Sequence, residues 1–440
     1  SPTSASIVEN AVLALQAAAT DANGDPLTFS LGGGADAARF SISAAGALSF
    51  AVPPSFETAA DSDGDNVYQV TIVVSDGRAQ TAQSVQIRVT DSREGIAVRQ
   101  LTSVGRRVTA VAVTPAGGLL FGLPDGNVIQ YDPATGTRTL LTNGGLSPVG
   151  EIIGIASGIN YATSRTFFYT AVINGQISVY TGGQSFAGAP LFTGSAILSI
   201  PHGDFSNNIA APIVAAADGS VYVLTGDAGG VGDPRGSAQD PNSKLGKVIR
   251  LTRNPDPFAG ATPQPYLIGL AANGLHNPNG AAIINGSIIF GDRGETIAGE
   301  INALRLDAAM GFFGWPSFEG NNSLIAGATP GAAPLIVVPF GNGPRNGRSI
   351  VGGNLYTGPI ASLSGTYVFG DSDGSIWTTA VTTSGGGITP SSSSNYERRN
   401  LDFAPATGTL NTILGIVQAT DGAMYLIDSD GDVFVVEPGS

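Results

Sequence analysis

Residues 421–434 read DGAMYLIDSDGDVF, two short apolar runs with a turn sequence between them. Asp430-Gly431 separates the runs, and Asp-Gly is a strong signal for a tight β-hairpin because both central residues of that turn need positive φ. A second pair, Asp421-Gly422, precedes the first run, so another strand is expected before it. The stretch therefore predicts a sheet of antiparallel strands joined by tight turns.

The same unit of turn, aromatic-containing strand, turn and apolar strand recurs through residues 96–440. Six copies are found, and their aromatic markers lie 48 to 77 residues apart, which is the size of one propeller blade with loop insertions. This period predicts a six-bladed β-propeller, whereas the alternative, a large irregular sandwich, would not repeat a motif in this way. The markers are Phe121, Tyr169, Tyr222, Phe290, Tyr367 and Tyr425.

Residues 1–95 have a different pattern. Apolar and polar residues alternate clearly over Val67–Val74, turns rich in Gly, Asp and Asn separate the runs, and Asp91–Gly95 ends the alternation. These features predict a Greek-key β-sandwich, so the whole chain is expected to be all-β. The predicted strands are 13–19, 27–31, 40–42, 47–50, 67–74 and 82–89.

The composition limits the classes of function. The chain has 440 residues, no Cys, only two Lys and a net charge of −14, so disulfides and thiol catalysis are excluded and nucleic acid is not an expected partner. No apolar run reaches the roughly 18 to 20 residues of a membrane span, so membrane insertion is not expected. We expect an extracellular or cell-surface bacterial protein.

Acidic residues collect at the turns of the first domain. Carboxylate oxygens in Gly-containing loops suit Ca²⁺, although Asp and Asn also favour turns without any metal. Val8-Glu9-Asn10, Asp21-Ala22-Asn23, Phe56-Glu57 and Ser75-Asp76-Gly77 make residues 1–95 resemble a bacterial cadherin-like domain. The resemblance implies one Ca²⁺ site at Glu9, Glu57 and Asp91, and another at the opposite end at Asp21, Asn23 and Asp76.

Several motifs make residues 97–440 resemble the soluble PQQ-dependent glucose and aldose sugar dehydrogenases. They include 226–234 (GDAGGVGDP), 274–280 (GLHNPNG), 291–295 (GDRGE) and 313–316 (FGWP). The resemblance implies pyrroloquinoline quinone (PQQ) at the mouth of the central channel, a bound Ca²⁺ and a histidine general base. Main-chain carbonyls of Gly294 and Glu295 match the loop that holds the Ca²⁺.

The sequence departs from that family at the positions that matter for catalysis. The position of the catalytic histidine is occupied by Asn208, whose amide cannot act as a base near neutral pH. His276 stands where the family has a PQQ-pairing arginine, next to the retained Asn277, and Val149 stands where it has a quinone-binding glutamine. His202 replaces the base only if its loop carries a compensating insertion.

Arg345 and Arg348 are candidates to supply positive charge to an acidic ligand, and surface ion pairs are the alternative role for both. The leading hypothesis is a non-catalytic, calcium-binding adhesion or assembly protein whose partners are neighbouring surface proteins or copies of itself. A PQQ-dependent sugar or alcohol dehydrogenase with His202 or His276 as base is the second hypothesis, and an extracellular module that binds glycans is the third.

Overall fold

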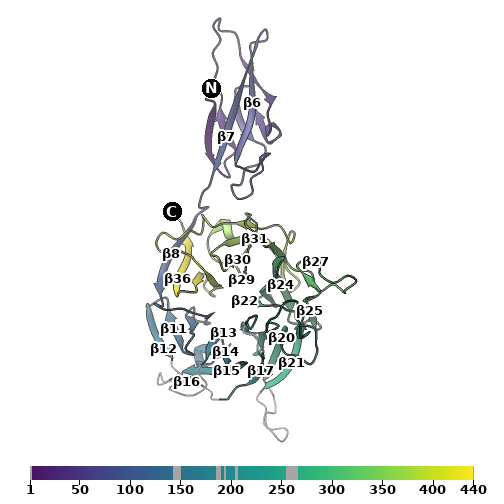
Figure 1. Ribbon diagram of the computed structural model, residues 1–440. Helices are drawn as coiled ribbons and strands as arrows, with labels where there is room; N and C mark the ends of the chain where they lie inside the picture. Colours follow the sequence, from purple (N-terminus) through teal and green to yellow (C-terminus); the bar gives the residue numbers. More distant parts are fainter. Residues whose placement is uncertain are drawn as a thin grey trace. The chain divides into compact units, whose positions relative to one another are not determined.

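The computed structural model is almost entirely β, and its contacts divide it into two units, Ser1–Glu94 and Gly95–Ser440 (Figure 1). The helical segments of the described chain are the single turns α1 (Tyr161–Ser164), η1 (Ala37–Arg39) and η2 (Ala361–Leu363). Among the described residues, no helix is long and apolar enough to span a membrane. The structure describes residues 2–141, 150–184, 190–192, 195–203, 207–253, 266–343 and 345–439.

The first unit is the predicted two-sheet sandwich. Alternate residues of one strand, Tyr68, Val70 and Ile72, are buried against the rings of Phe40 and Phe50 from the other sheet. One sheet has the order β1 (Ser4–Val8), β7 (Gln80–Thr90), β6 (Val67–Ser75) and β3 (Thr28–Gly33), and the other has β2 (Leu13–Gln16), β5 (Ala47–Phe50) and β4 (Phe40–Ile42). The alternation pattern had not predicted β1, which pairs in parallel with β7.

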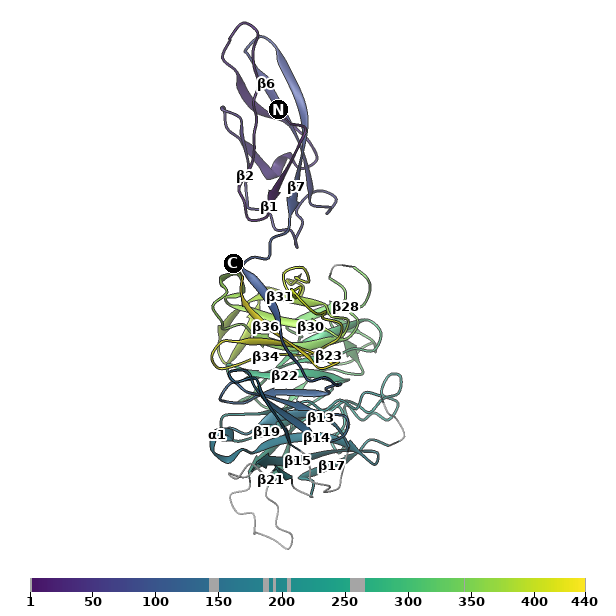
Figure 2. The same ribbon diagram turned by 90° about the vertical axis from the view of Figure 1, so that its left-hand side faces the viewer.

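The second unit is a six-bladed propeller, as predicted (Figures 1 and 2). All six aromatic markers lie on the second strand of their blades and are buried.

Blades 1 to 3 are β9 (Ala110–Val113), β10 (Leu119–Gly122), β11 (Val128–Asp132) and β12 (Thr137–Leu141); β13 (Glu151–Ser157), β14 (Phe167–Ile173), β15 (Gln176–Gln184), β16 (Pro190–Phe192) and β17 (Leu198–Pro201); and β18 (Ile213–Ala215), β19 (Val221–Leu224), β20 (Lys247–Arg253), β21 (Tyr266–Asn273) and β25 (Gly311–Phe312).

Blades 4 to 6 are β22 (Pro278–Ile284), β23 (Ser287–Arg293), β24 (Ala298–Arg305) and β28 (Ile336–Pro339); β29 (Ile350–Leu355), β30 (Thr366–Asp371), β31 (Ile376–Ser384), β32 (Gly387–Pro390) and β33 (Glu397–Arg398); and β34 (Ile413–Gln418), β35 (Met424–Asp428), β36 (Asp432–Pro438) and β8 (Ile96–Ser103). A short hairpin, β26 (Phe318–Glu319) with β27 (Asn322–Ser323), lies outside the blades.

The ring of blades is closed by strands from opposite ends of the unit. β8, which opens the propeller, pairs antiparallel with β36, and the register runs from Asp432 opposite Ser103 to Pro438 opposite Ile96. Side chains of β8 enter the same core as β34, β35 and β36, with Ile96 and Val98 both buried. Blade 6 is therefore complete only when the first and last strands have met.

A buried aspartate recurs at one position in blades 4, 5 and 6. Asp292, Asp371 and Asp428 each lie at or next to the end of the second strand, and each accepts the two backbone N–H groups that precede the inner strand of the same blade. In blade 5 the donors are the backbone N–H groups of Arg348 and Ser349, at 2.6 and 2.8 Å from Asp371 Oδ2. Backbone donors at the start of an inner strand are thus satisfied without water.

Replacing Asp371 with alanine is expected to lower the free energy of unfolding of the propeller by about 1–3 kcal/mol, because two backbone N–H groups lose a buried carboxylate acceptor. The measurement is urea unfolding of the full chain, with Asp307→Ala as the control because Asp307 is exposed. If the two variants unfold at the same urea concentration, Asp371 is not the acceptor that these N–H groups require.

Candidate functional site

The long loop between β19 and β20 carries the glycine-rich stretch singled out in the sequence. Its start is held between two other segments: Asp227 N donates to the His276 carbonyl, and Ala228 N donates to the Asn208 carbonyl. A Cβ at Gly226 would lie 2.0 Å from the Asn208 carbonyl oxygen, so no larger residue fits there. Residues 208, 227 and 276, from three separate loops, are thereby brought into contact.

Asp227 is the centre of a buried polar network. Its Oδ1 accepts hydrogen bonds from Gly229 N at 2.9 Å and Asn208 Nδ2 at 3.2 Å, and its Oδ2 accepts one from Trp315 Nε1 at 2.8 Å. Asn208 Nδ2 also contacts His276 Nε2 at 2.9 Å, and the His276 and Trp315 rings are 4.2 Å apart. Burial raises the pKa of Asp227, and these hydrogen bonds partly oppose that effect.

The hydrogen bonds assign the tautomer of His276. Its Nδ1 contacts the Arg293 carbonyl, which can only accept, so Nδ1 carries the proton. Nε2 then holds the lone pair and accepts from Asn208, whose amide orientation is fixed by its bond to Asp227. The imidazole is only 4% exposed and has both nitrogens engaged within the protein. It is not placed to accept a proton from a substrate.

A second buried cluster lies beside His276 and had been missed as a site. Asp292, Glu300 and Glu319 line a cavity of about 10 Å³. Asn302 is 1% exposed, and its Oδ1 has no hydrogen-bond partner among the described residues, while its Nδ2 donates to Glu300 Oε2. Burial raises the pKa of Glu300 to about 7, and burial together with Glu300 raises that of Asp292 well above its usual range.

Carboxylate and amide oxygens are the ligands that Ca²⁺ prefers, and the cavity has room for one ion or one water molecule. The sequence signal for this cluster was the three acids Asp292, Glu300 and Glu319, none of which had been assigned a role. Among the described residues, the groups of three carboxylates whose oxygens lie within 4.8 Å of one another do not include this cluster, and its oxygens accept backbone hydrogen bonds, including those from Thr296, Ile297 and Ala298 to Glu319 Oε1.

Lys247 fixes the end of the long loop between β19 and β20. The residue is fully buried, and its Nζ donates to the carbonyls of Ser237, Ala238 and Leu245 at 2.6 to 2.9 Å. Within the same loop, Asp233 accepts the backbone N–H groups of Ser237 and Ala238. Burial lowers the pKa of Lys247 to about 8. The ammonium group occupies the position that a structural cation would take.

The first unit contains a carboxylate cluster of its own. Glu9, Glu57 and Asp91 each place a carboxylate oxygen within 4.8 Å of the other two, so the structure brings together the three residues predicted for one Ca²⁺ site. Glu9 is buried, and it accepts the backbone N–H groups of Phe56 and Ser92, both at 2.9 Å. These bonds place the Glu9 carboxylate between the two segments that carry the other acids.

Comparison with known proteins agrees with both parts of this description. The family model described as Glucose / Sorbosone dehydrogenase matches residues 152–329, and the one described as Bacterial Ig domain matches residues 1–90. The first match lies within the propeller and the second covers the sandwich.

Solved structures show the same propeller fold. A putative glucose dehydrogenase of Thermus thermophilus is 18% identical, with a TM-score of 0.58, over 78% of this chain and 100% of that one. The PQQ-bound aldose sugar dehydrogenase of Streptomyces coelicolor is 18% identical, with a TM-score of 0.56, over 78% and 98%. The HIPL1 protein of Arabidopsis thaliana is 25% identical over 53% of this chain, which spans 39% of that protein's length.

The residues at the implied quinone site do not fit PQQ. The network places Asn208 against His276, at the positions for which the resemblance implies a base and a cation, and both side chains are bonded to protein groups. Val149 lies outside the described residues.

Other predicted residues have structural partners. His202 follows β17 at the outer edge of blade 2, and its carbonyl accepts from Arg235. Arg345 donates to the Ser394 carbonyl and Arg348 to Asn342 Oδ1, so the partners given by the structure are neutral.

The loop predicted to hold Ca²⁺ in the propeller lies next to the buried acids. Asn277 N donates to Asp292, and Glu295 Oε2 accepts the Gly232 N–H at 3.0 Å. Gly294 is buried, and a Cβ there would lie 1.9 Å from the Ala298 carbonyl oxygen. Calcium ligation by the carbonyls of Gly294 and Glu295 stays a prediction.

The residues predicted for the opposite end of the Ig-like domain form turns. Asp21 Oδ1 accepts the backbone N–H of Asn23, and Asp76 Oδ1 accepts those of Arg78 and Ala79. Asp61, Asp63 and Asp65 instead form the second group of described carboxylates with oxygens within 4.8 Å of one another. Their Asp-X-Asp-Gly-Asp spacing was visible in the sequence but had not been selected.

Raising the pH from 7.5 to 9.5 is expected to increase the contribution of Lys247 to stability. Its pKa is about 8 in the folded protein and 10.5 when unfolded, so the unfolded chain binds more protons in this window and the free energy of unfolding rises. Lys247→Met should abolish the rise and be less stable at both pH values, because three carbonyls lose their donor. Urea unfolding checks this, with Lys244→Met as control; an unchanged pH dependence in Lys247→Met would contradict it.

Calcium is expected to raise the melting temperature of the Ig-like domain, because an ion that binds only the folded state stabilises it, by about 2.7 kcal/mol at a hundred times the dissociation constant. Scanning calorimetry of the full chain with Ca²⁺ and with EDTA measures the shift. The double variant Glu57→Gln/Asp91→Asn should lose it and Asp76→Asn should keep it. Identical melting of metal-free and Ca²⁺-loaded protein would leave the acids of this domain with a role in turns only.

Proposed function

We propose that the protein is a non-catalytic assembly or adhesion protein of a bacterial surface, in which a calcium-binding Ig-like domain carries a sugar-dehydrogenase-like propeller. A bacterial Ig domain fits an extracellular or surface protein. The propeller acts as a scaffold and does not oxidise sugars. Its partners are neighbouring surface proteins or further copies of the same chain.

The observation that carries the proposal is the closed network of Asn208, Asp227 and His276. Sugar oxidation at this place needs a group that takes the hydroxyl proton, and loss of a general base typically costs about 10²- to 10⁴-fold in rate. Asn208 does not titrate, and the lone pair of His276 is used by Asn208. A site with these contacts is built for stability and not for proton transfer.

The calcium part of the proposal rests on the cluster of Glu9, Glu57 and Asp91. Three carboxylates held this close repel one another unless a cation or protons neutralise them. Phe56 and Ser92 fix Glu9 through backbone N–H groups, so the cluster is held in place before any ion binds. Ca²⁺ bound there would link the segments that carry the three acids.

The edge strands of the sandwich are candidate sites at which another chain could pair with this one. β3 and β4 each have a strand neighbour on one side only in their sheets, and unpaired edges invite strand addition by another chain. This favours protein partners over glycans, for which a planar aromatic platform would be the expected feature.

A PQQ-dependent dehydrogenase is the second candidate, because the family model covers residues 152–329 and one structural neighbour is a PQQ-bound enzyme. In that case the loops that hold Asn208 and Asp227 would have to rearrange when the quinone binds. His276 contacts Asn208 in these loops.

Calorimetric titration of PQQ into the full chain with Ca²⁺ present separates the two candidates. We expect no binding heat, no shift in melting temperature and no oxidation of aldoses with an added electron acceptor. His276→Arg restores the cation implied by the resemblance and serves as a matched variant. Micromolar binding by the wild-type protein, with aldose oxidation that Asp227→Asn abolishes, would overturn the non-catalytic proposal in favour of the dehydrogenase.

A further inference from the structure

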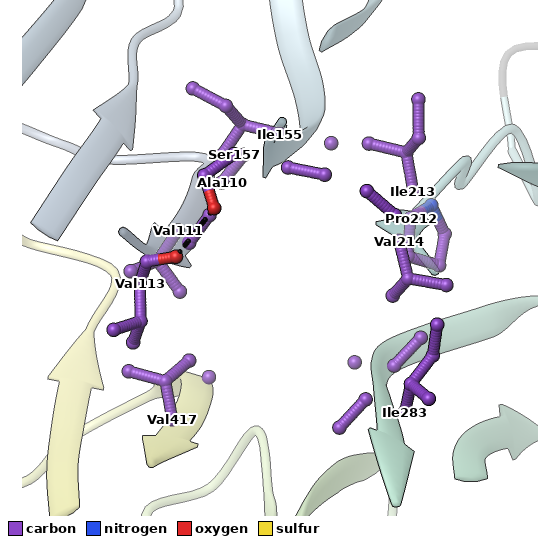
Figure 3. A pocket seen from close by; sticks show the side chains of 18 of the residues that line it. Ala110, Val111, Val113, Ile155, Ser157, Pro212, Ile213, Val214, Ile283 and Val417 are labelled. Carbon is purple, nitrogen blue, oxygen red and sulfur yellow. Dashed lines mark hydrogen bonds between the residues drawn. The ribbon is translucent and has the colours of Figure 1, made fainter. Parts of the chain in front are cut away.

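Every blade of the propeller is a sheet with an inner and an outer edge. The inner strands, β9, β13, β18, β22, β29 and β34, surround the central channel, a cavity of about 800 Å³ (Figure 3). Their inner edges face one another inside the ring, in a space too small for a second folded chain. An outer edge faces away from the ring, so its unpaired backbone groups are open to a strand from another chain.

The outer edge of blade 3 is formed by β21 (Figure 1). This strand pairs with β20 from end to end, whereas on its other side the two-residue strand β25 pairs only with Ala272 and Asn273. Within the part of the chain that the structure describes, no strand pairs with the outer edge of residues 266–270. The backbone groups on that edge are left to water or to another chain.

This free edge is apolar and uncharged. Leu267 is 52% exposed and Ile268 is 44% exposed, and Gly269 beside them is exposed as well. In the described part of the propeller, β21 is the only strand with more than one large apolar side chain exposed to this extent. Residues 266–273 (YLIGLAAN) include no charged side chain, although the chain has a net charge of −14. An edge of this kind lacks the charges that keep edge strands of monomeric proteins apart.

The exposed residues lie on a strand that is anchored on both sides of them. The Tyr266 ring lies edge-on to the Phe168 ring of blade 2, with the ring centroids 6.1 Å apart. Leu270 packs against the same hydrophobic core. Leu267 and Ile268 are therefore held in extended conformation before any partner arrives, so pairing would not require this strand to fold first.

The order of side chains along the edge is self-complementary. The free stretch is centred on Ile268, so an antiparallel copy related by a two-fold axis places Ile268 opposite Ile268 of the second copy. Leu267 then lies opposite Gly269 of the second copy, and Tyr266 lies opposite Leu270. A Cβ added at Gly269 would have no atom within 4 Å, so open space beside this residue can receive a leucine side chain. Each opposed pair thus combines apolar groups of matching size.

We propose that two copies of the chain pair through residues 266–270 of β21, antiparallel about a two-fold axis at Ile268, so that blade 3 of one propeller continues into blade 3 of the other. A two-fold contact uses the same patch on both partners and must be self-complementary, as this edge is. Two chains of charge −14 repel each other, and an uncharged edge is where they can approach. The inference rests on the assembly part of the proposed function and names the surface that copies of the chain would use.

Sedimentation velocity of the full chain measures the association, at about 1–100 µM protein and about 0.5 M salt to screen the repulsion between the chains. We expect wild-type protein to form dimers over this range. Ile268→Lys places two ammonium groups opposite each other, so it should weaken dimerisation at least tenfold. Leu140→Lys is the matched control and should dimerise like the wild type, because Leu140 is 50% exposed on β12, the outer strand of blade 1.

A cysteine at the axis tests the register of the pairing. The chain has no Cys, so Ile268→Cys introduces a single thiol. Residues directly opposite each other in antiparallel strands have Cα atoms about 4.5–5.5 Å apart, which a disulfide can span. Mild oxidation should therefore link most Ile268→Cys chains into dimers on a non-reducing gel, whereas Leu140→Cys chains should stay largely unlinked.

Three results would overturn the proposal. They are wild-type protein that stays monomeric at the highest concentration, dimers that persist in folded Ile268→Lys protein, and equal cross-linking of the two cysteine variants. Circular dichroism and melting curves establish that the variants fold. If Ile268→Lys does not fold, the wild-type sedimentation and the two cysteine variants still decide the question.

Failure of this contact is distinguishable from failure of the proposed function. A monomeric chain that neither binds PQQ nor oxidises aldoses would overturn pairing through β21 and leave the non-catalytic proposal standing. A dimer that Ile268→Lys disrupts, and that oxidises aldoses with PQQ, would do the reverse.

Discussion

The pairing of β8 with β36 is the contact on which the propeller depends. It joins residues 96–103 to residues 432–438, so the two ends of the unit must meet before blade 6 has its fourth strand. Each blade packs against its neighbours around the ring, and an incomplete blade 6 would expose its own core and one face of blade 1. Ile96 and Val98 of β8 pack in the same hydrophobic core as side chains of β34, β35 and β36. The channel and the loop network both presuppose a closed ring.

Within that ring, the region that resembles a quinone site is occupied by the protein's own groups. Asp227 collects hydrogen bonds from three loops, and Lys247 holds the other end of the long loop through three carbonyls. Both are buried ionisable groups with shifted pKa values, a combination common at active sites and also in structural networks. Here every contact of His276 is internal, which favours the structural role. A protein can therefore keep this propeller fold without keeping the catalytic activity of the fold's other members.

Much of the architecture could be predicted because turn chemistry and alternation are local. Asp430-Gly431 and its counterparts predicted the hairpins. Buried Tyr68 and Val70 are separated by exposed Gln69, the alternation expected of a half-buried strand. The strand β1 escaped notice because Ser4–Val8 gains its place from β7, more than seventy residues away. For the same reason, counting residues could place Asn208 and His276 at family positions but could not show that they bond to each other. Nor could it show that Asn302 Oδ1, beside Glu300, has no hydrogen-bond partner within the part of the chain that the structure describes.

The register of the closing strands also determines how the propeller would respond to mechanical load. The chain enters blade 6 at Ile96 directly opposite Pro438, where it leaves, and Gly439 N donates to the Gly95 carbonyl at 2.7 Å. Tension applied between these two neighbouring points pulls the strands apart from one end, so the hydrogen bonds break one after another. A surface protein stretched in this way would open its ring at a low force and yield gradually.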